Sequence, residues 1–400
     1  DSKSPARFSN NRLSYIPNHF FEGLHNLKEL YLDRNSLRDL PEELLKLTKL
    51  EILDLSNNSN NNLLGSITPD ISKLTKLRLL YLDNNQLTSL PDSIGRLKSL
   101  CVLRLNNNNI ESLPDAICSL HQLQVLELRA NLLSSLPENI KELENLAKLD
   151  ISNNKLTLLP NELVKCNRLT HLNAHNNLLE SIPAKFGQLS RLLTLNLCEN
   201  RLINLPADIG KLTSLTELDL SHNEFIVLPE DLGKLTKLTE IKLNNNPSLL
   251  AIPDSFQKLV LVRKIHLQHC SLSQIPFEMG LVYNQLSYVN LSYNHFDTMP
   301  NLQGMDHVIS FNISNNRIND ITEQIDQLEM LRELYVVNNK LTHIPKTIGR
   351  LKELEIMDVS ENVLVDLPLS IGDCINLREL RLRGNSIETL PITLGKLTNL

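Results

Sequence analysis

The sequence predicts an α/β solenoid: a right-handed, curved stack of repeats with one parallel sheet on its concave face and short helical or irregular segments on its convex face. Two observations predict it. A motif of about 23 residues returns in register along the whole chain. Each copy joins a short stretch of alternating apolar residues to a stretch with helical spacing. One copy cannot bury its apolar edge alone, so the copies must stack.

The repeat is clear from Leu27, where the chain reads LKELYLDRNSLRDLPEELLKLTK, and from Leu77, where it reads LRLLYLDNNQLTSLPDSIGRLKS. Sixteen full units follow the template LxxLxLxxNxLxxLPxxIgxLxx and fill residues 27–399. Residues 1–26 carry a partial unit, and Leu400 begins a further one. We therefore expect a single domain over all 400 residues. The spacing is irregular near residues 58–62, where four residues are inserted, and in the tenth to twelfth units.

The spacing of residues in the template predicts the local structure of each repeat. In LxLxx the two leucines point inward and the residues between them point outward, as in a short strand. In LPxxIgxL the apolar residues are spaced as in a helical turn, and the proline fixes the backbone that leads into it. Stacking the units therefore produces one parallel sheet and one continuous leucine core.

Composition excludes several classes of protein. The net charge of −6 and the lack of a basic stripe argue against nucleic-acid binding. No apolar run is long enough to span a bilayer. The six cysteines are scattered, without a CxxC pair, which is typical of reduced thiols in a cytoplasmic protein. They are Cys101, Cys118, Cys166, Cys198, Cys270 and Cys374.

Cys270 directly follows His269 and lies close to His266 in the sequence, and cysteine with histidine is a combination that nucleophilic enzymes use. The repeat offers a simpler interpretation. The ninth template position is asparagine in fifteen of the sixteen units and Cys270 in the other. We therefore expect Cys270 to replace a buried asparagine, and Cys166 and Cys374 to replace core leucines. No set of residues has enzymatic geometry, so we expect no catalysis.

The histidines suggest a metal site, but their spacing argues against it. His171 and His175 are four residues apart on an extended strand, which is roughly 13 Å and too far for shared coordination. Glycine-rich phosphate loops are also missing from the sequence. We expect no metal and no cofactor, and interpret the histidines as polar surface open to a partner.

The outward strand positions, three and five of the template, predict a contact surface for a protein. Four consecutive units place apolar residues there, framed by aromatic and charged ones, and the middle units add acidic, histidine and tyrosine side chains. The predicted partner-binding residues are Tyr31, Ile52, Leu79, Tyr81, Val102, Arg104, Val125, Glu127, His171, His175, Asp219, His222, His266, Tyr288 and Tyr293.

The whole chain resembles the leucine-rich-repeat family. Three segments, LPDSIGRLKSL at 90–100, LPADIGKLTSL at 205–215 and IPKTIGRLKEL at 344–354, are similar to the Ras-group form of the repeat. That group includes cytoplasmic scaffolds that bind Ras-type GTPases and protein phosphatase one, and polarity proteins. The resemblance implies a non-catalytic interaction scaffold in intracellular signalling, with a Ras-type small GTPase or a phosphatase catalytic subunit as the partner.

Two other interpretations stay open. IPNHFFEGLHNL at 16–27 resembles the repeats of extracellular receptors, and LLGSITPDISKL at 63–74 resembles the plant receptor form. These segments imply the ligand-recognition ectodomain of a receptor. The chain could also be the targeting region of a larger signalling enzyme.

Overall fold

The structure is a computed structural model that describes residues 5–58, 65–276 and 285–400. Most of the insertion expected near 58–62 lies outside these residues. The chain divides into two compact units, Asp1–Arg201 and Leu202–Leu400, each of which is described by itself. A single domain over residues 1–400 stays a prediction.

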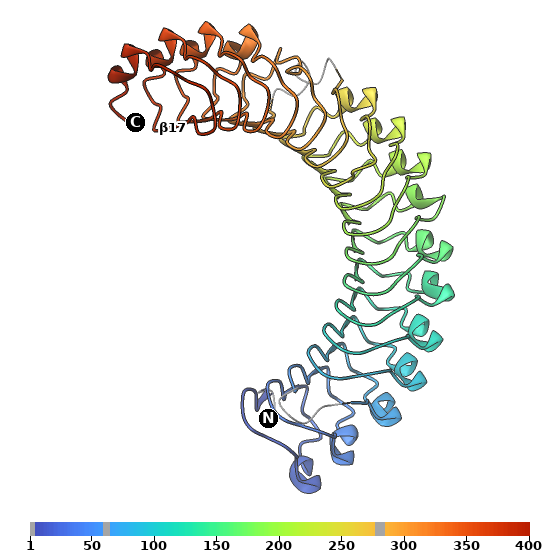
Figure 1. The fold of residues 1–400 in the computed structure, drawn as a ribbon. Helices are drawn as coiled ribbons and strands as arrows, with labels where there is room; N and C mark the ends of the chain where they lie inside the picture. The colour runs from blue at the N-terminus through green and yellow to red at the C-terminus, as the bar shows by residue number, and fades with distance from the viewer. Residues whose placement is uncertain (1–4, 59–64, 277–284) are drawn as a thin grey trace. The chain divides into compact units, whose positions relative to one another are not determined.

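The first unit is a parallel sheet in which every strand pairs with the next one along the chain (Figure 1). Apart from the two-residue β1, each strand of this unit is only three residues long, with a buried middle residue and two outward neighbours. This confirms the alternation expected from the template. The strands are β1 (Ala6–Arg7), β2 (Glu29–Tyr31), β3 (Ile52–Asp54), β4 (Leu79–Tyr81), β5 (Val102–Arg104), β6 (Val125–Glu127), β7 (Lys148–Asp150), β8 (His171–Asn173) and β9 (Thr194–Asn196).

The second unit repeats this arrangement, again with each strand paired in parallel to its successor. Its core is also built from the middle residues of the strands, such as Ile241 and Leu334, which are buried. The strands are β10 (Glu217–Asp219), β11 (Glu240–Lys242), β12 (Lys264–His266), β13 (Tyr288–Asn290), β14 (Ser310–Asn312), β15 (Glu333–Tyr335), β16 (Ile356–Asp358) and β17 (Glu379–Arg381).

Short 3-10 turns form the return segments, which confirms the expected helical or irregular character. A proline precedes most of them. Thr322 takes its place before η12, where its hydroxyl accepts a hydrogen bond from the amide of Gln324. The turns of the first unit are η1 (Asn18–Phe21), η2 (Glu42–Lys46), η3 (Pro69–Lys73), η4 (Asp92–Arg96), η5 (Asp115–Ser119), η6 (Glu138–Glu142), η7 (Asn161–Lys165) and η8 (Phe186–Gln188). Those of the second are η9 (Ala207–Lys211), η10 (Glu230–Lys234), η11 (Asp254–Lys258), η12 (Glu323–Gln327), η13 (Lys346–Arg350), η14 (Leu369–Asp373) and η15 (Ile392–Lys396).

The asparagines at template position nine, which we call the ladder asparagines, hold neighbouring repeats together. The Asn108 amide donates to the carbonyls of Leu105 in its own repeat, at 3.0 Å, and Leu82 in the preceding one, at 2.9 Å. Its side-chain oxygen accepts from the Leu87 amide at 3.0 Å. The residue before it, Asn107, has a φ of 54° and turns the chain out of the strand. Backbone groups that no strand could pair are thereby satisfied inside the stack.

Candidate functional site

We define the strand face as the outward side chains of the three-residue strands. Ile52, Leu79, Val102 and Val125 are register neighbours on it, each paired with the next across β3 to β6. The structure therefore brings the four predicted apolar residues together as consecutive positions. All four are half-buried, because neighbouring side chains cover part of each one. We call these four residues the apolar ladder. Its side chains are less accessible to solvent than those of a fully exposed apolar patch.

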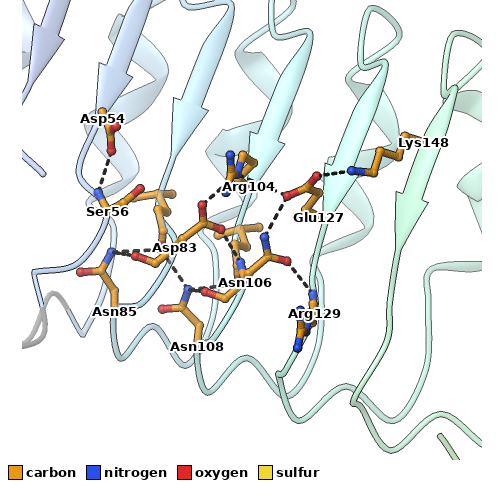
Figure 2. A network of polar contacts seen from close by, with 12 residues as sticks. Asp54, Ser56, Asp83, Asn85, Arg104, Asn106, Asn108, Glu127, Arg129 and Lys148 are labelled. Carbon is orange, nitrogen blue, oxygen red and sulfur yellow. Dashed lines mark hydrogen bonds and ion pairs between the residues drawn. The ribbon is translucent and has the colours of Figure 1, made fainter. Parts of the chain in front are cut away.

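A chain of ion pairs runs beside this apolar ladder (Figure 2). The Arg104 guanidinium lies 2.8 Å from the Asp83 carboxylate and 3.3 Å from that of Glu127. Lys148 then contacts Glu127 at 2.7 Å. Two of the predicted binding residues, Arg104 and Glu127, are thus paired with each other. Their charges are held in place before any partner arrives.

Asn106 ties this network to the backbone. Its side-chain amide donates to Glu127 at 2.9 Å, and its backbone amide donates to Asp83 at 2.8 Å. Its side-chain oxygen accepts from the backbone amide of Arg129 at 2.9 Å (Figure 2). The carboxylates therefore have few rotamers open to them, and the face is preorganised for contact.

Burial and pairing act in opposite directions on these acids. Burial raises the pKa of Asp83, and the favourable charge of Arg104 offsets only part of this effect. Burial also raises the pKa of Asp54, whose carboxylate accepts from the Ser56 amide at 2.9 Å. Burial opposes ionisation of Glu127 as well, but its hydrogen bonds with Lys148 and Asn106 and the nearby positive charges lower its pKa. Of the three acids, Glu127 is the one whose negative charge the surroundings favour.

Two tyrosines stand at the same strand position as Arg104. The Arg7 guanidinium lies 4.4 Å from the centre of the Tyr31 ring, and the Tyr31 hydroxyl donates to Glu29 at 3.1 Å. Arg104 lies 5.5 Å from the centre of the Tyr81 ring. Cation–π contacts thus hold both rings, which remain half-exposed beside the apolar ladder.

The predicted histidines of the first unit lie apart from this site. His171 is exposed on β8, where its Nδ1 contacts the hydroxyl of Thr170 at 2.8 Å. His175 lies in the turn after β8 and not on the strand itself. Its Nε2 is 3.1 Å from the amide of Asn153.

The predicted residues of the second unit form smaller groups. Asp219 accepts from the Ser221 hydroxyl at 2.6 Å, and His222 contacts the Asn245 amide at 3.0 Å in the following turn. His222 has a φ of 52°, so its side chain belongs to the turn. Asp219 and His222 are therefore surface groups held by short-range contacts.

His266, Tyr288 and Tyr293 are arranged as aromatic pairs. The ring centres of His266 and Tyr288 are 5.1 Å apart, and Tyr293 stacks on His269 at 3.9 Å. Burial lowers the pKa of His266 although Glu240 lies 3.3 Å away. Tyr293 remains 49% exposed and is available to a partner.

Cys270 has the structural role that the repeat predicts. Its thiol is 6% exposed and donates to the Leu243 carbonyl at 3.3 Å, as a ladder asparagine would. Burial raises the pKa of this thiol to about 11, the opposite of what a nucleophile requires. Cys166 and Cys374 are fully buried in the core, as expected.

Sequence reasoning missed Asp83, Asn106 and Lys148. Asp83 and Asn106 occupy template position seven, just after the strand, whereas the predicted surface was drawn from positions three and five. A signal was present, since acidic and basic residues alternate across neighbouring repeats at Asp83, Arg104 and Glu127. Charges of opposite sign on adjacent repeats attract each other.

No helix in the described part of the chain is both long and apolar enough to cross a membrane. Family models of the leucine-rich repeat match most of the sequence. The model "Leucine-rich repeat region" matches residues 66–132. The model "Leucine rich repeat" matches 8–59, 174–225 and 330–387, and a third of the same name matches 145–166. The matched models describe repeats, and none of them indicates a catalytic family.

Solved structures and a relative agree with these models. A leucine-rich-repeat protein of Leptospira interrogans is 32% identical, with a TM-score of 0.77 over 96% of this chain and 90% of that one. The receptor kinase HAESA of Arabidopsis, solved with a peptide hormone and a co-receptor, is 31% identical, with a TM-score of 0.78 over 98% of this chain and 68% of that one.

Fibromodulin of Sus scrofa is 34% identical over 83 residues, which are 21% of this chain and 52% of fibromodulin. The chain thus spans about half the length of that relative. These similarities agree with the sequence repeat, the ladder asparagines and the parallel strands. The chain belongs to the leucine-rich-repeat family, as a protein-interaction domain.

Proposed function

We propose that the chain is a non-catalytic scaffold of intracellular signalling, and that it binds a globular protein through the strand face of β2 to β7. The observation that carries this proposal is the apolar ladder of Ile52, Leu79, Val102 and Val125 beside charges that are already fixed by ion pairs. Apolar positions supply binding energy, and fixed charges supply orientation and steering. A small GTPase of the Ras type or a phosphatase catalytic subunit is the proposed partner.

The cysteines support a cytoplasmic location. All six cysteines are reduced, and four of them are buried. The sequence also contains N-glycosylation motifs, Asn-x-Ser, at Asn290 and Asn312, whose side chains lie on the strand face. Each accepts a hydrogen bond at 3.0 Å, from the amides of Ser292 and Ser314 respectively. A glycan would attach to the side-chain nitrogen and would stand on the strand face of β13 and β14, outside the proposed binding surface of β2 to β7.

A receptor ectodomain is the second candidate. Its support is the likeness to the HAESA structure, which holds a peptide hormone and a co-receptor. An extended peptide would contact the strand face along many repeats, whereas a globular partner would concentrate on a few. Carbohydrate on Asn290 or Asn312 in protein from its natural source would favour this candidate over the scaffold.

The test is capture of partners from cell extract by the wild type and by Leu79→Glu with Val102→Lys. These positions are register neighbours, so the new charges lie side by side and attract each other. Losing two half-buried apolar contacts costs about 1 kcal/mol each, which lowers the melting temperature by only a few degrees. We expect the double variant to fold and to lose the partner.

The matched control is Leu158→Glu with Leu193→Lys. It introduces the same charges at two exposed apolar positions that lie outside the strands. This variant should keep the partner. A small GTPase or phosphatase subunit that is lost only with the strand-face variant supports the proposal. An identical set of captured proteins with both variants contradicts it.

A further inference from the structure

A second group of reactive side chains lies away from the apolar ladder, in two turns at the carboxyl ends of β8 and β9. His175 follows β8, and Cys198 holds the equivalent position in the next repeat. Glu199 comes next, with a φ of 53°. An imidazole nitrogen, the thiol and a carboxylate oxygen all lie within 4.8 Å of one another.

One nitrogen of His175 is suited to a ligand. Its Nε2 is 3.1 Å from the Asn153 amide, whereas its Nδ1 is buried and has no hydrogen-bond partner. A buried polar atom without a partner costs free energy, and a bound cation would remove that cost. Coordination through Nδ1 places the ring proton on Nε2, so the Asn153 amide must turn its oxygen toward the ring. That oxygen accepts from the Asn176 amide at 2.8 Å, so the Asn176 amide must reorient with it.

The donor set selects the metal. Calcium and magnesium require oxygen ligands throughout, so a thiolate and an imidazole exclude them. Nitrogen, sulfur and one carboxylate are the ligands of zinc. A tetrahedral zinc shell sets its ligand atoms about 3.3–3.8 Å apart. The ligand atoms here lie within 4.8 Å of one another, and rotation of the exposed Glu199 side chain can bring its carboxylate to the tetrahedral separation.

We propose that His175, Cys198 and Glu199 form a zinc-binding site, with water in the fourth position. The spacing argument that excluded His171 with His175 does not apply here, because the ligands come from neighbouring repeats and not from one strand. The site does not depend on the proposed partner, so the two hypotheses can fail separately.

Titration of the full chain with Co²⁺ tests the site, because cobalt bound to a thiolate absorbs in the near-ultraviolet. We expect one Co²⁺ per chain with this absorption and its loss when Zn²⁺ is added. Cys198→Ser should abolish the band. His175→Gln and Glu199→Gln should each weaken cobalt binding at least tenfold. Because Glu199 is exposed, its variant keeps the test valid if a change at the half-buried Cys198 prevents folding.

The matched controls are Cys101→Ser and His171→Gln, which change the same residue types outside the cluster and should leave the titration unchanged. A thiolate band that survives Cys198→Ser, or that is unaffected by both His175→Gln and Glu199→Gln, would overturn the proposal. So would cobalt binding without a thiolate band in the wild type.

Discussion

The hydrogen bonds of the preceding repeat explain why position 270 is a cysteine and not an asparagine. A ladder asparagine normally accepts a hydrogen bond from an amide of the preceding repeat. Before Cys270 that repeat is one residue longer, and the corresponding amide, that of Leu249, donates to the Asn246 carbonyl at 3.0 Å instead. An acceptor is therefore not needed at position 270. The thiol keeps the donor contact to Leu243, which is the part of the asparagine's role that remains.

This contact changes the expected effect of Cys270→Asn. From the sequence alone, the substitution should be neutral or mildly stabilising. The structure predicts that it is destabilising, by about 1–3 kcal/mol, because the new side-chain oxygen is buried without a donor. Urea denaturation measures the difference. Asn108→Cys is the reciprocal control and should also destabilise, since the Leu87 amide then loses its acceptor. A Cys270→Asn variant more stable than the wild type would contradict this account.

At the level of the secondary-structure elements, the glycine of the IG pair sets how closely neighbouring 3-10 turns pack. A Cβ added at Gly95, in η4, would lie 2.3 Å from the backbone oxygen of Ala116 in η5. Gly210 and Gly233 make the same approach to the following turn, at 2.4 Å and 2.3 Å. The obstacle in each case is backbone, which cannot rotate away as a side chain can.

We therefore predict that Gly95→Ala destabilises the first unit. In an ordinary turn or helix this change gains up to about 1 kcal/mol by restricting the unfolded chain. Here the overlap forces the turns apart and costs about 1–3 kcal/mol. The midpoint of urea denaturation should fall, and Arg96→Ala, on the exposed side of the same turn, should leave it nearly unchanged. An unchanged or higher midpoint for Gly95→Ala would show that the turns can move apart freely.

Across the whole chain, repetition makes backbone features predictable. Fifteen ladder asparagines and the alternation in each strand are visible in the sequence, and with them the places of Ile52, Leu79, Val102 and Val125 on one face. Since position in the repeat determines which residues become neighbours, the apolar ladder could be predicted from the sequence alone.

Side-chain pairing could not be predicted in the same way. The pairing of Arg104 with Asp83 depends on rotamers and on a residue outside the strand. The approach of His175 to Cys198 depends on the turn that follows each strand. The half-burial of the apolar ladder depends on how far neighbouring side chains extend. Position in the repeat determines none of these, so they required atomic positions.

The central claim is that a protein partner covers the strand face of the first unit. Oxidation by hydroxyl radicals, read by mass spectrometry with and without the captured partner, tests it most directly, because tyrosine rings react readily when exposed. We predict that the partner slows oxidation of Tyr31 and Tyr81 several-fold and leaves Tyr15, which is 72% exposed and lies outside the strands, unchanged. Unchanged rates at Tyr31 and Tyr81, together with protection of residues on the 3-10 turns, would place the partner on the opposite face and contradict the claim.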